Sequence, residues 1–102
     1  MDSQLKKGLL EICVLSILAK KDSYGYQIVR DINDYIQISE STLYPVLKRL
    51  SNNNFVCTYN VEHNNRLRKY YKITEYGIAY IKEFLNNWNQ IEGIYTLAKG
   101  GI

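Results

Sequence analysis

The side chains whose types and spacing suit a chemical task are polar and cationic, and they fall in two stretches. The first, Ile38–Leu50, carries Ser41, Thr42, Tyr44, Lys48 and Arg49 away from its apolar side chains. The second holds four cations in seven residues, namely Arg66, Arg68, Lys69 and Lys72. Hydroxyls and cations in this pattern are typical of surfaces that bind nucleic-acid phosphates and base edges. The alternatives are an ordinary solvated helix face and a charged edge strand that resists aggregation.

Catalysis is not indicated by any residue pattern. His63 is the only histidine, and it is predicted at the tip of a hairpin. The sequence contains no Ser/His/Asp or Cys/His arrangement, no paired carboxylates with catalytic spacing, no metal-ligand spacing and no glycine-rich phosphate loop. We therefore expect no enzyme activity, no cofactor and no metal site.

Composition predicts one soluble domain. The chain has 102 residues, 46% of them hydrophobic, and a net charge of +3, which tolerates an anionic partner without requiring one. Cys13 and Cys57 lie in apolar runs, so we expect both to be reduced core residues. Leu9–Ala19 is apolar but too short to span a membrane, and no signal peptide is visible, so a cytoplasmic location is expected.

Three helices are predicted in the first half of the chain. Leu5–Ala19 is apolar around nearly its whole circumference, and Tyr24–Tyr35 has a buried stripe that includes Tyr35. In the third helix, an apolar stripe at helical spacing comprises Leu43, Val46, Leu47 and Leu50. Pro45 is best tolerated in a first turn, which predicts Thr42 as the N-cap. The second and third helices, with the connector Ile36–Glu40, form a helix-turn-helix pattern.

A hairpin and a long helix complete the chain. Phe55–Val61 and Leu67–Ile73 have strand composition, and Asn64–Asn65 between them can adopt positive φ in a tight turn. The expected fold is therefore mainly α with a small β-hairpin, a winged helix-turn-helix. Glu75–Lys99, capped by Thr74, is predicted as a final helix of roughly 37 Å.

The final helix carries a coiled-coil-like seam. Side chains with alternating spacings of three and four residues are Ile81, Phe84, Trp88, Ile91, Tyr95 and Ala98. A compact domain cannot cover this seam alone, so we expect a homodimer in which Leu9 and Ile12 of the first helix also take part. This divides the chain into a DNA-binding part, residues 1–73, and a dimerisation part, residues 74–102. The alternative is packing of the seam on the chain's own first helix.

Three segments together resemble the PadR family of transcriptional regulators. They are Tyr24–Ile28, Ser41–Leu47 with Arg49–Leu50, and Arg66–Thr74 with Gly77. The resemblance implies a winged helix-turn-helix homodimer of the short type that binds double-stranded operator DNA, usually as a repressor. The family often has glycine where Ser41, Asn54 and Asn65 stand; the two asparagines accommodate positive φ, whereas Ser41 leaves the operator sequence open.

The resemblance also implies roles for individual residues. Ser41, Thr42, Tyr44, Lys48 and Arg49 would lie near bases or phosphates, and Arg66, Arg68 and Lys69 near an adjacent backbone or minor groove. Some short family members bind flat aromatic or cationic compounds between their subunits, which suggests Trp88 with Phe84 and Ile91 here. The alternative for Trp88 is a plain hydrophobic anchor. A winged helix can also be a protein-interaction module, although such a module would present an apolar or acidic face.

Overall fold

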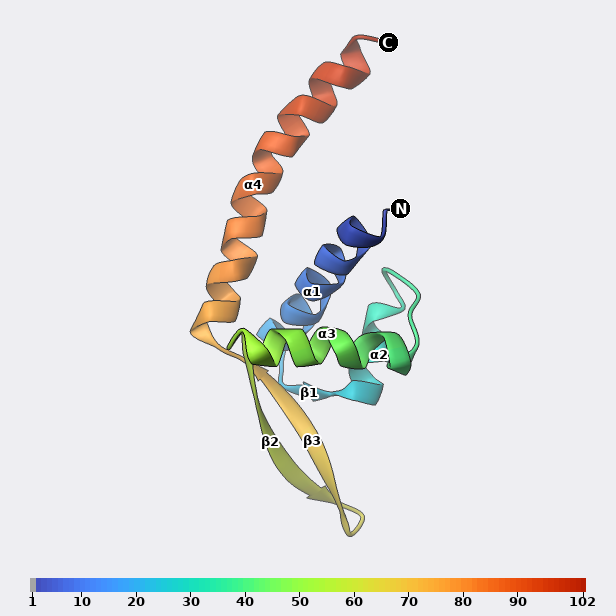
Figure 1. Ribbon diagram of the computed structural model, residues 1–102, viewed down its shortest axis with the longest axis vertical. Helices are drawn as coiled ribbons and strands as arrows, with labels where there is room; N and C mark the ends of the chain where they lie inside the picture. The colour runs from blue at the N-terminus through green and yellow to red at the C-terminus, as the bar shows by residue number, and fades with distance from the viewer. Residues whose placement is uncertain (1) are drawn as a thin grey trace.

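The computed structural model describes residues 2–102 and consists of four helices and a three-stranded sheet (Figure 1). In chain order the elements are α1 (Ser3–Lys20), β1 (Ser23–Tyr24), α2 (Gly25–Ile32), α3 (Glu40–Asn52), β2 (Val56–His63), β3 (Arg66–Ile73) and α4 (Glu75–Gly100). This order confirms the predicted winged helix-turn-helix with a long final helix.

The core lies among α1, α2 and α3. The α3 stripe is confirmed, since Leu43, Val46, Leu47 and Leu50 are all buried. They pack in one cluster with side chains from the middle of α1 and from α2, including Val14, Leu15, Leu18, Ile28 and Ile32. Burying this stripe fixes which face of α3 remains outside.

The sheet has a third strand that the sequence analysis missed. Strand β1 pairs antiparallel with β3 through Ser23↔Tyr71 and Tyr24↔Tyr70, giving the order β1-β3-β2. Helix α2 therefore begins at Gly25, because Tyr24 is extended and belongs to the sheet. The helix also ends earlier than predicted, at Ile32, and the prediction that Tyr35 is buried is wrong: its side chain is 77% exposed.

The start of α3 also differs from the prediction. Ser39, not Thr42, is the N-cap residue, and its carbonyl accepts hydrogen bonds from the backbone N–H groups of Thr42 and Leu43 at 3.1 Å each. Pro45 is the sixth helical residue, so the helix lacks one backbone bond there. The proline is exposed, and the buried stripe on the opposite side continues through this turn. Tertiary packing thus outweighs the local preference of proline for a first turn.

Asparagines with positive φ form the turns on both sides of β2. Asn64 and Asn65 have φ values of 52° and 65° and form a two-residue turn, which lets the strands extend to His63 and Arg66. Asn54 likewise has a φ of 63° just after α3. The positive φ values expected at Asn54, Asn64 and Asn65 are therefore confirmed. Cys57 is exposed on β2, so its assignment to the core is wrong, whereas Cys13 is half-buried.

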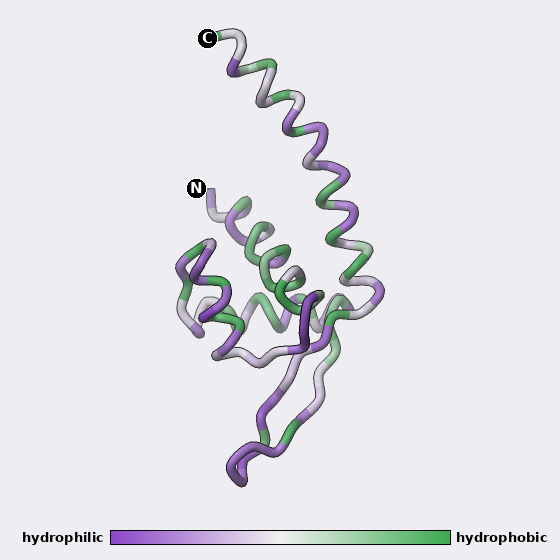
Figure 2. Tube along the Cα trace, turned by 180° about the vertical axis from the view of Figure 1, so that it is seen from behind, coloured by the Kyte–Doolittle hydropathy of each residue, from purple (hydrophilic) through white to green (hydrophobic). Residues whose placement is uncertain are grey.

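Helix α4 is fixed at its first turn, packs against the core and α1 as far as Phe84, and is exposed from Leu85 onward. The Thr74 hydroxyl accepts a hydrogen bond from Gly77 N at 3.2 Å, which confirms the predicted cap, and donates one to Asn54 O at 2.6 Å. The helix continues through Gly93 to Gly100, and apolar and polar residues alternate along it (Figure 2). Because α4 and the wing project at opposite ends, the molecule measures 60 × 27 × 21 Å.

Candidate nucleic-acid interface

The outer face of α3 presents a cluster of hydroxyl groups at the start of the helix. Ser39 Oγ lies 2.8 Å from Ser41 Oγ and 3.3 Å from Thr42 Oγ1, and all three side chains are exposed. Unpaired backbone N–H groups and the positive end of the helix dipole accompany these hydroxyls. Lys48 lies exposed two turns further along the helix. This end of α3 can therefore donate several hydrogen bonds to an anion.

Tyr44 lies on one flank of this face, over the start of α2. A Cβ atom at Gly25 would come within 2.8 Å of the Tyr44 hydroxyl, so the glycine leaves room for the ring. The hydroxyl donates a hydrogen bond to Glu40 at 3.4 Å. Burial, followed by the charge and hydrogen bond of Glu40, raises the pKa of Tyr44 above its usual value, so this side chain is a protonated donor at neutral pH.

Arg49 differs from the other predicted contact residues of α3 because it is half-buried. Its Nε and Nη2 atoms are buried and have no hydrogen-bond partner among residues 2–102. Two of the guanidinium nitrogens are thus turned away from solvent, on the flank of α3 opposite Tyr44. Lys48 is the more accessible cation of this helix.

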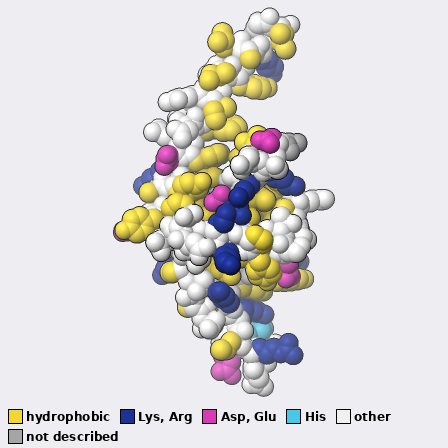
Figure 3. All heavy atoms as spheres, viewed as in Figure 1, with side chains coloured by type: hydrophobic (Ala, Val, Ile, Leu, Met, Phe, Trp, Pro, Cys, Tyr) yellow, Lys and Arg dark blue, Asp and Glu magenta, His cyan; other side chains and the backbone are white. Residues whose placement is uncertain are grey.

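The cations of the wing lie on both faces of β3, with Arg66, Arg68 and Lys72 on one face and Lys69 on the other. The Arg68 guanidinium lies 4.0 Å from the centroid of the Tyr24 ring, and Lys69 Nζ lies 5.6 Å from that of Tyr71 on the other face. Arg66 is exposed next to the turn, opposite His63. Figure 3 shows Lys and Arg side chains from the centre of the molecule down to the wing, whereas the upper helix is mostly apolar or uncharged.

A groove of about 410 Å³ joins α3 to the wing. Its lining comes from the β1–α2 junction, from α3 and from β3: Tyr24, Gly25, Tyr26, Tyr44, Arg68, Lys69 and Tyr71. The structure thus brings Tyr44 together with Arg68 and Lys69, while Ser41, Lys48 and Arg66 lie outside this groove. Tyr24 and Tyr26 were not predicted as site residues. The signal for them was the Tyr24–Gly25–Tyr26 segment, whose aromatic rings flank the glycine that Tyr44 covers.

The predicted seam of α4 is only partly covered. Ile81 and Phe84 are half-buried, whereas Trp88, Ile91 and Tyr95 are 41%, 49% and 63% exposed. The Trp88 ring stacks on Phe84 with a centroid distance of 5.9 Å, and Trp88 Nε1 donates a hydrogen bond to Glu92 at 3.1 Å. Half-buried Leu9 and Ile12 line a groove of about 360 Å³ between α1 and α4, together with Phe84.

None of the helices between residues 2 and 102 combines the length and hydrophobicity that a membrane span requires.

The fold and sequence match those of known regulators. The model of the PadR-like transcriptional regulator family matches residues 14–83. A Streptococcus mutans UA159 protein, smu.1704, is 38% identical, with 94% of this chain and 92% of that chain covered and a TM-score of 0.81. A PadR-like transcription factor from Bacteroides fragilis is 32% identical, with coverages of 92% and 93% and a TM-score of 0.83.

One further structure contains nucleic acid. Bacillus subtilis PadR in complex with operator DNA shares the fold, with a TM-score of 0.71, at 23% identity over 76% of this chain and 46% of that chain. The family match covers well over half of the chain, and both longer alignments exceed 30% identity. The chain therefore belongs to the PadR-like family of transcriptional regulators.

Proposed function

We propose that this protein binds double-stranded operator DNA as a homodimer and represses transcription. The observation that carries this proposal is the groove between α3 and the wing, where Tyr44 meets Arg68 and Lys69. Hydrogen-bond donors from a recognition helix and cations from a wing suit a duplex, whose backbone carries regularly spaced phosphates. The operator complex of Bacillus subtilis PadR, which has the same fold, supports this assignment.

The two elements have different tasks in this proposal. Helix α3 enters the major groove, with Ser41, Thr42, Tyr44 and Lys48 near base edges or phosphates. The wing residues Arg66, Arg68 and Lys69 contact an adjacent backbone or the minor groove, where cations contribute affinity more than sequence preference. Arg49 offers less of its guanidinium to such a contact than an exposed arginine would, because two of its nitrogens face inward.

Dimerisation through α4 places two such surfaces on one duplex. Residues 1–73 provide the DNA-binding part, and residues 74–102 the dimerisation part. The exposure of Trp88, Ile91 and Tyr95 supports a second chain as the partner of the seam, with Ile81, Phe84, Leu9 and Ile12 at its base. A two-fold dimer of this kind reads half-sites about one helical turn apart, roughly 34 Å.

A gel shift tests the proposal directly. The protein is titrated against the DNA upstream of its own gene and of the neighbouring genes, and the affinity is measured at several salt concentrations. We expect a shifted complex whose log K falls with log salt by about 0.9 for each phosphate contact. A slope near zero, or no complex with any of these fragments, would exclude operator binding and favour the alternative of a protein-interaction module.

We further propose that a flat aromatic or cationic compound releases the repressor by binding near Trp88, with Phe84 and Ile91 beside it. The exposed, stacked indole supports this role, because a planar ring or a cation can lie against it. Titration of tryptophan fluorescence with planar aromatic compounds is a direct test, since Trp88 is the only tryptophan. An unchanged spectrum across a chemically broad panel would leave Trp88 as a hydrophobic anchor of the dimer.

A further inference from the structure

A row of three tyrosines crosses the sheet on one face. Tyr24 of β1, Tyr70 of β3 and Tyr59 of β2 occupy paired positions in the register, and we call them the tyrosine row. The centroids of Tyr24 and Tyr70 are 5.4 Å apart, and those of Tyr70 and Tyr59 are 5.6 Å apart. Cross-strand aromatic neighbours at these distances attract one another, so the row joins the wing to the short strand β1.

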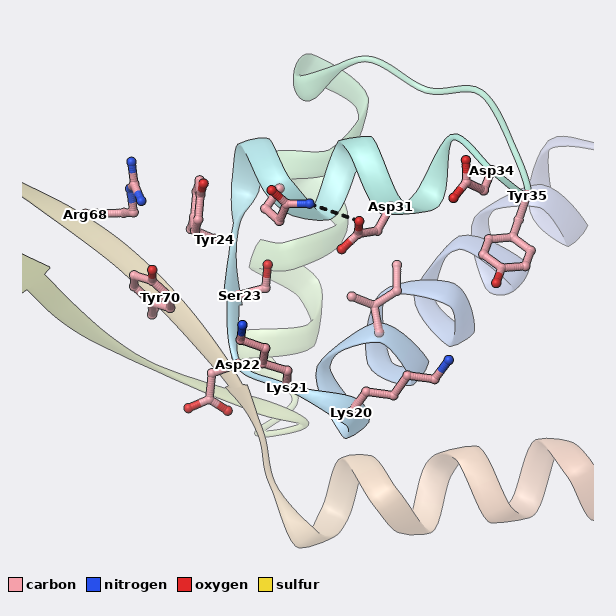
Figure 4. A pocket seen from close by; sticks show the side chains of 12 residues that line it. Lys20, Lys21, Asp22, Ser23, Tyr24, Asp31, Asp34, Tyr35, Arg68 and Tyr70 are labelled. Carbon is pink, nitrogen blue, oxygen red and sulfur yellow. Dashed lines mark hydrogen bonds between the residues drawn. The ribbon is translucent and has the colours of Figure 1, made fainter. Parts of the chain in front are cut away.

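The two ends of the row are each held by a charged side chain. At one end, the Arg68 guanidinium lies over the Tyr24 ring at 4.0 Å. At the other end, the Tyr59 hydroxyl donates a hydrogen bond of 2.7 Å to Asp22, which directly precedes β1. Figure 4 shows Arg68 beside Tyr24, with Tyr70 and Asp22 along the same hollow. The row is therefore anchored to the segment that leads into α2.

Arg68 lies where the edge of the sheet becomes free. Strand β1 ends at Tyr24, opposite Tyr70, and the chain then turns into α2, so β3 has no neighbour on this side at Arg68. The side chain borders both the hollow of Figure 4 and the groove next to α3. Its guanidinium lies on the Tyr24 ring. Stacking on a ring leaves the N–H groups at the guanidinium edge available.

We propose that Tyr24 is a positioning residue that holds Arg68 ready to bind a backbone phosphate at the rim of the groove between α3 and the wing. This inference rests on the proposed function, because the phosphate belongs to the bound duplex. A free arginine side chain loses rotational freedom when it binds, whereas a stacked guanidinium has already lost part of it. The preordering of one such side chain corresponds to roughly a 3- to 10-fold gain in affinity.

The test measures Kd against salt concentration by fluorescence anisotropy. The probe is a labelled duplex of about 30 base pairs and mixed sequence, which can hold two half-sites one turn apart. The proteins are the wild type, Tyr24→Leu, Arg68→Ala, the double variant and Arg68→Lys. Two controls are Tyr24→Phe, which keeps the ring, and Tyr35→Leu, which removes an exposed tyrosine from the same hollow.

We expect Tyr24→Leu and Arg68→Ala to weaken binding by roughly 3- to 10-fold and to reduce the salt slope by up to about 0.9. The double variant binds no more weakly than Arg68→Ala alone, because both substitutions remove the same contact. Arg68→Lys also weakens binding although it keeps the charge, since an ammonium group is not planar and cannot stack face to face on the ring. Both controls bind like the wild type.

Three outcomes overturn the inference. The first is a Tyr24→Leu protein with wild-type affinity and slope, and the second is a double variant whose loss is the product of the single losses. The third, Arg68→Lys with wild-type affinity, is decisive even if Tyr24→Leu fails to fold, because that variant leaves the tyrosine row intact. In these cases the wild type still binds with a salt-dependent Kd, and the proposed function stands. If the wild type binds no duplex, both the inference about Tyr24 and the proposed function are refuted.

Discussion

Gly77 is the position where one added methyl group should have the largest effect. A Cβ atom there would come within 2.6 Å of Ile73 Cγ1 and closer still to the carbonyl oxygen of Phe55. The same Phe55 oxygen accepts a hydrogen bond from Thr74 N, and Gly77 N donates to the Thr74 hydroxyl. Gly77→Ala must therefore move the first turn of α4 away from the segment between α3 and β2.

The expected cost has two parts. Overpacking of a buried site costs about 1–3 kcal/mol, and disruption of the Thr74 cap adds about 1 kcal/mol. The better helix propensity of alanine offsets up to about 1 kcal/mol of this loss of stability. Gly77→Ala should thus destabilise the fold by about 2 kcal/mol, or roughly 10 °C in melting temperature for a domain of this size.

Gly93→Ala is the matched control within the same helix. No atom lies within 4 Å of a Cβ at Gly93, so only the gain in propensity remains, about 1 kcal/mol of added stability. Both variants and the wild type are unfolded by heat and by urea at one protein concentration, because association would shift the midpoint. A Gly77→Ala protein as stable as the wild type, or two glycine variants that shift in the same direction, would refute this reasoning.

Four further predictions concern the wing, the interface and α3. Lys48→Ala should weaken operator binding and leave the oligomeric state unchanged, and unchanged affinity in a gel shift removes Lys48 from the contact residues. Trp88→Ala should lower the dimer fraction in sedimentation experiments by removing an anchor of the seam. Asn65→Gly should unfold at the wild-type urea concentration or above, whereas Asn65→Val should unfold earlier, since its φ is 65°. The hydrogen bond to Asp22 raises the pKa of Tyr59 from 10 to about 12, so stability from this bond is present below pH 10 and is lost between pH 10 and 12. Tyr59→Phe should lack that part of the decline in alkaline urea titrations, and identical pH profiles would contradict the assignment.

Local patterns predicted those parts of the fold that depend on neighbours in the sequence. The buried stripe of α3 follows from helical spacing, the wing turn from two asparagines, and the start of α4 from a threonine cap. In each case the residue type and the backbone conformation are linked within a few positions. The positions of Tyr44 and Lys48 outside the stripe follow from the same periodicity.

The missed features depend on partners far along the chain. Strand β1 has two residues, too few for a periodic signal, and it exists because Tyr70 and Tyr71 of β3 pair with it. The close packing at Gly25 was expected, but its partner, Tyr44, lies far along the chain. The exposure of Cys57 depends on which face of β2 meets the core. The predicted start of α3 was wrong because it relied on the preference of proline for a first turn. The burial of four side chains keeps α3 helical on both sides of Pro45 despite that preference.

The hydrogen bonds around Thr74 connect the start of α4 firmly to the rest of the domain, while the far end of the helix projects from it. The helix is about 39 Å long, so a swing of 10° at its base moves its far end by roughly 7 Å. Asn54 and Phe55, which receive the bonds of Thr74, connect α3 to β2. A tilt of α4 should therefore move α3 and the wing together. In the proposed homodimer, the crossing angle of the two α4 helices would then set the distance between the two α3 helices.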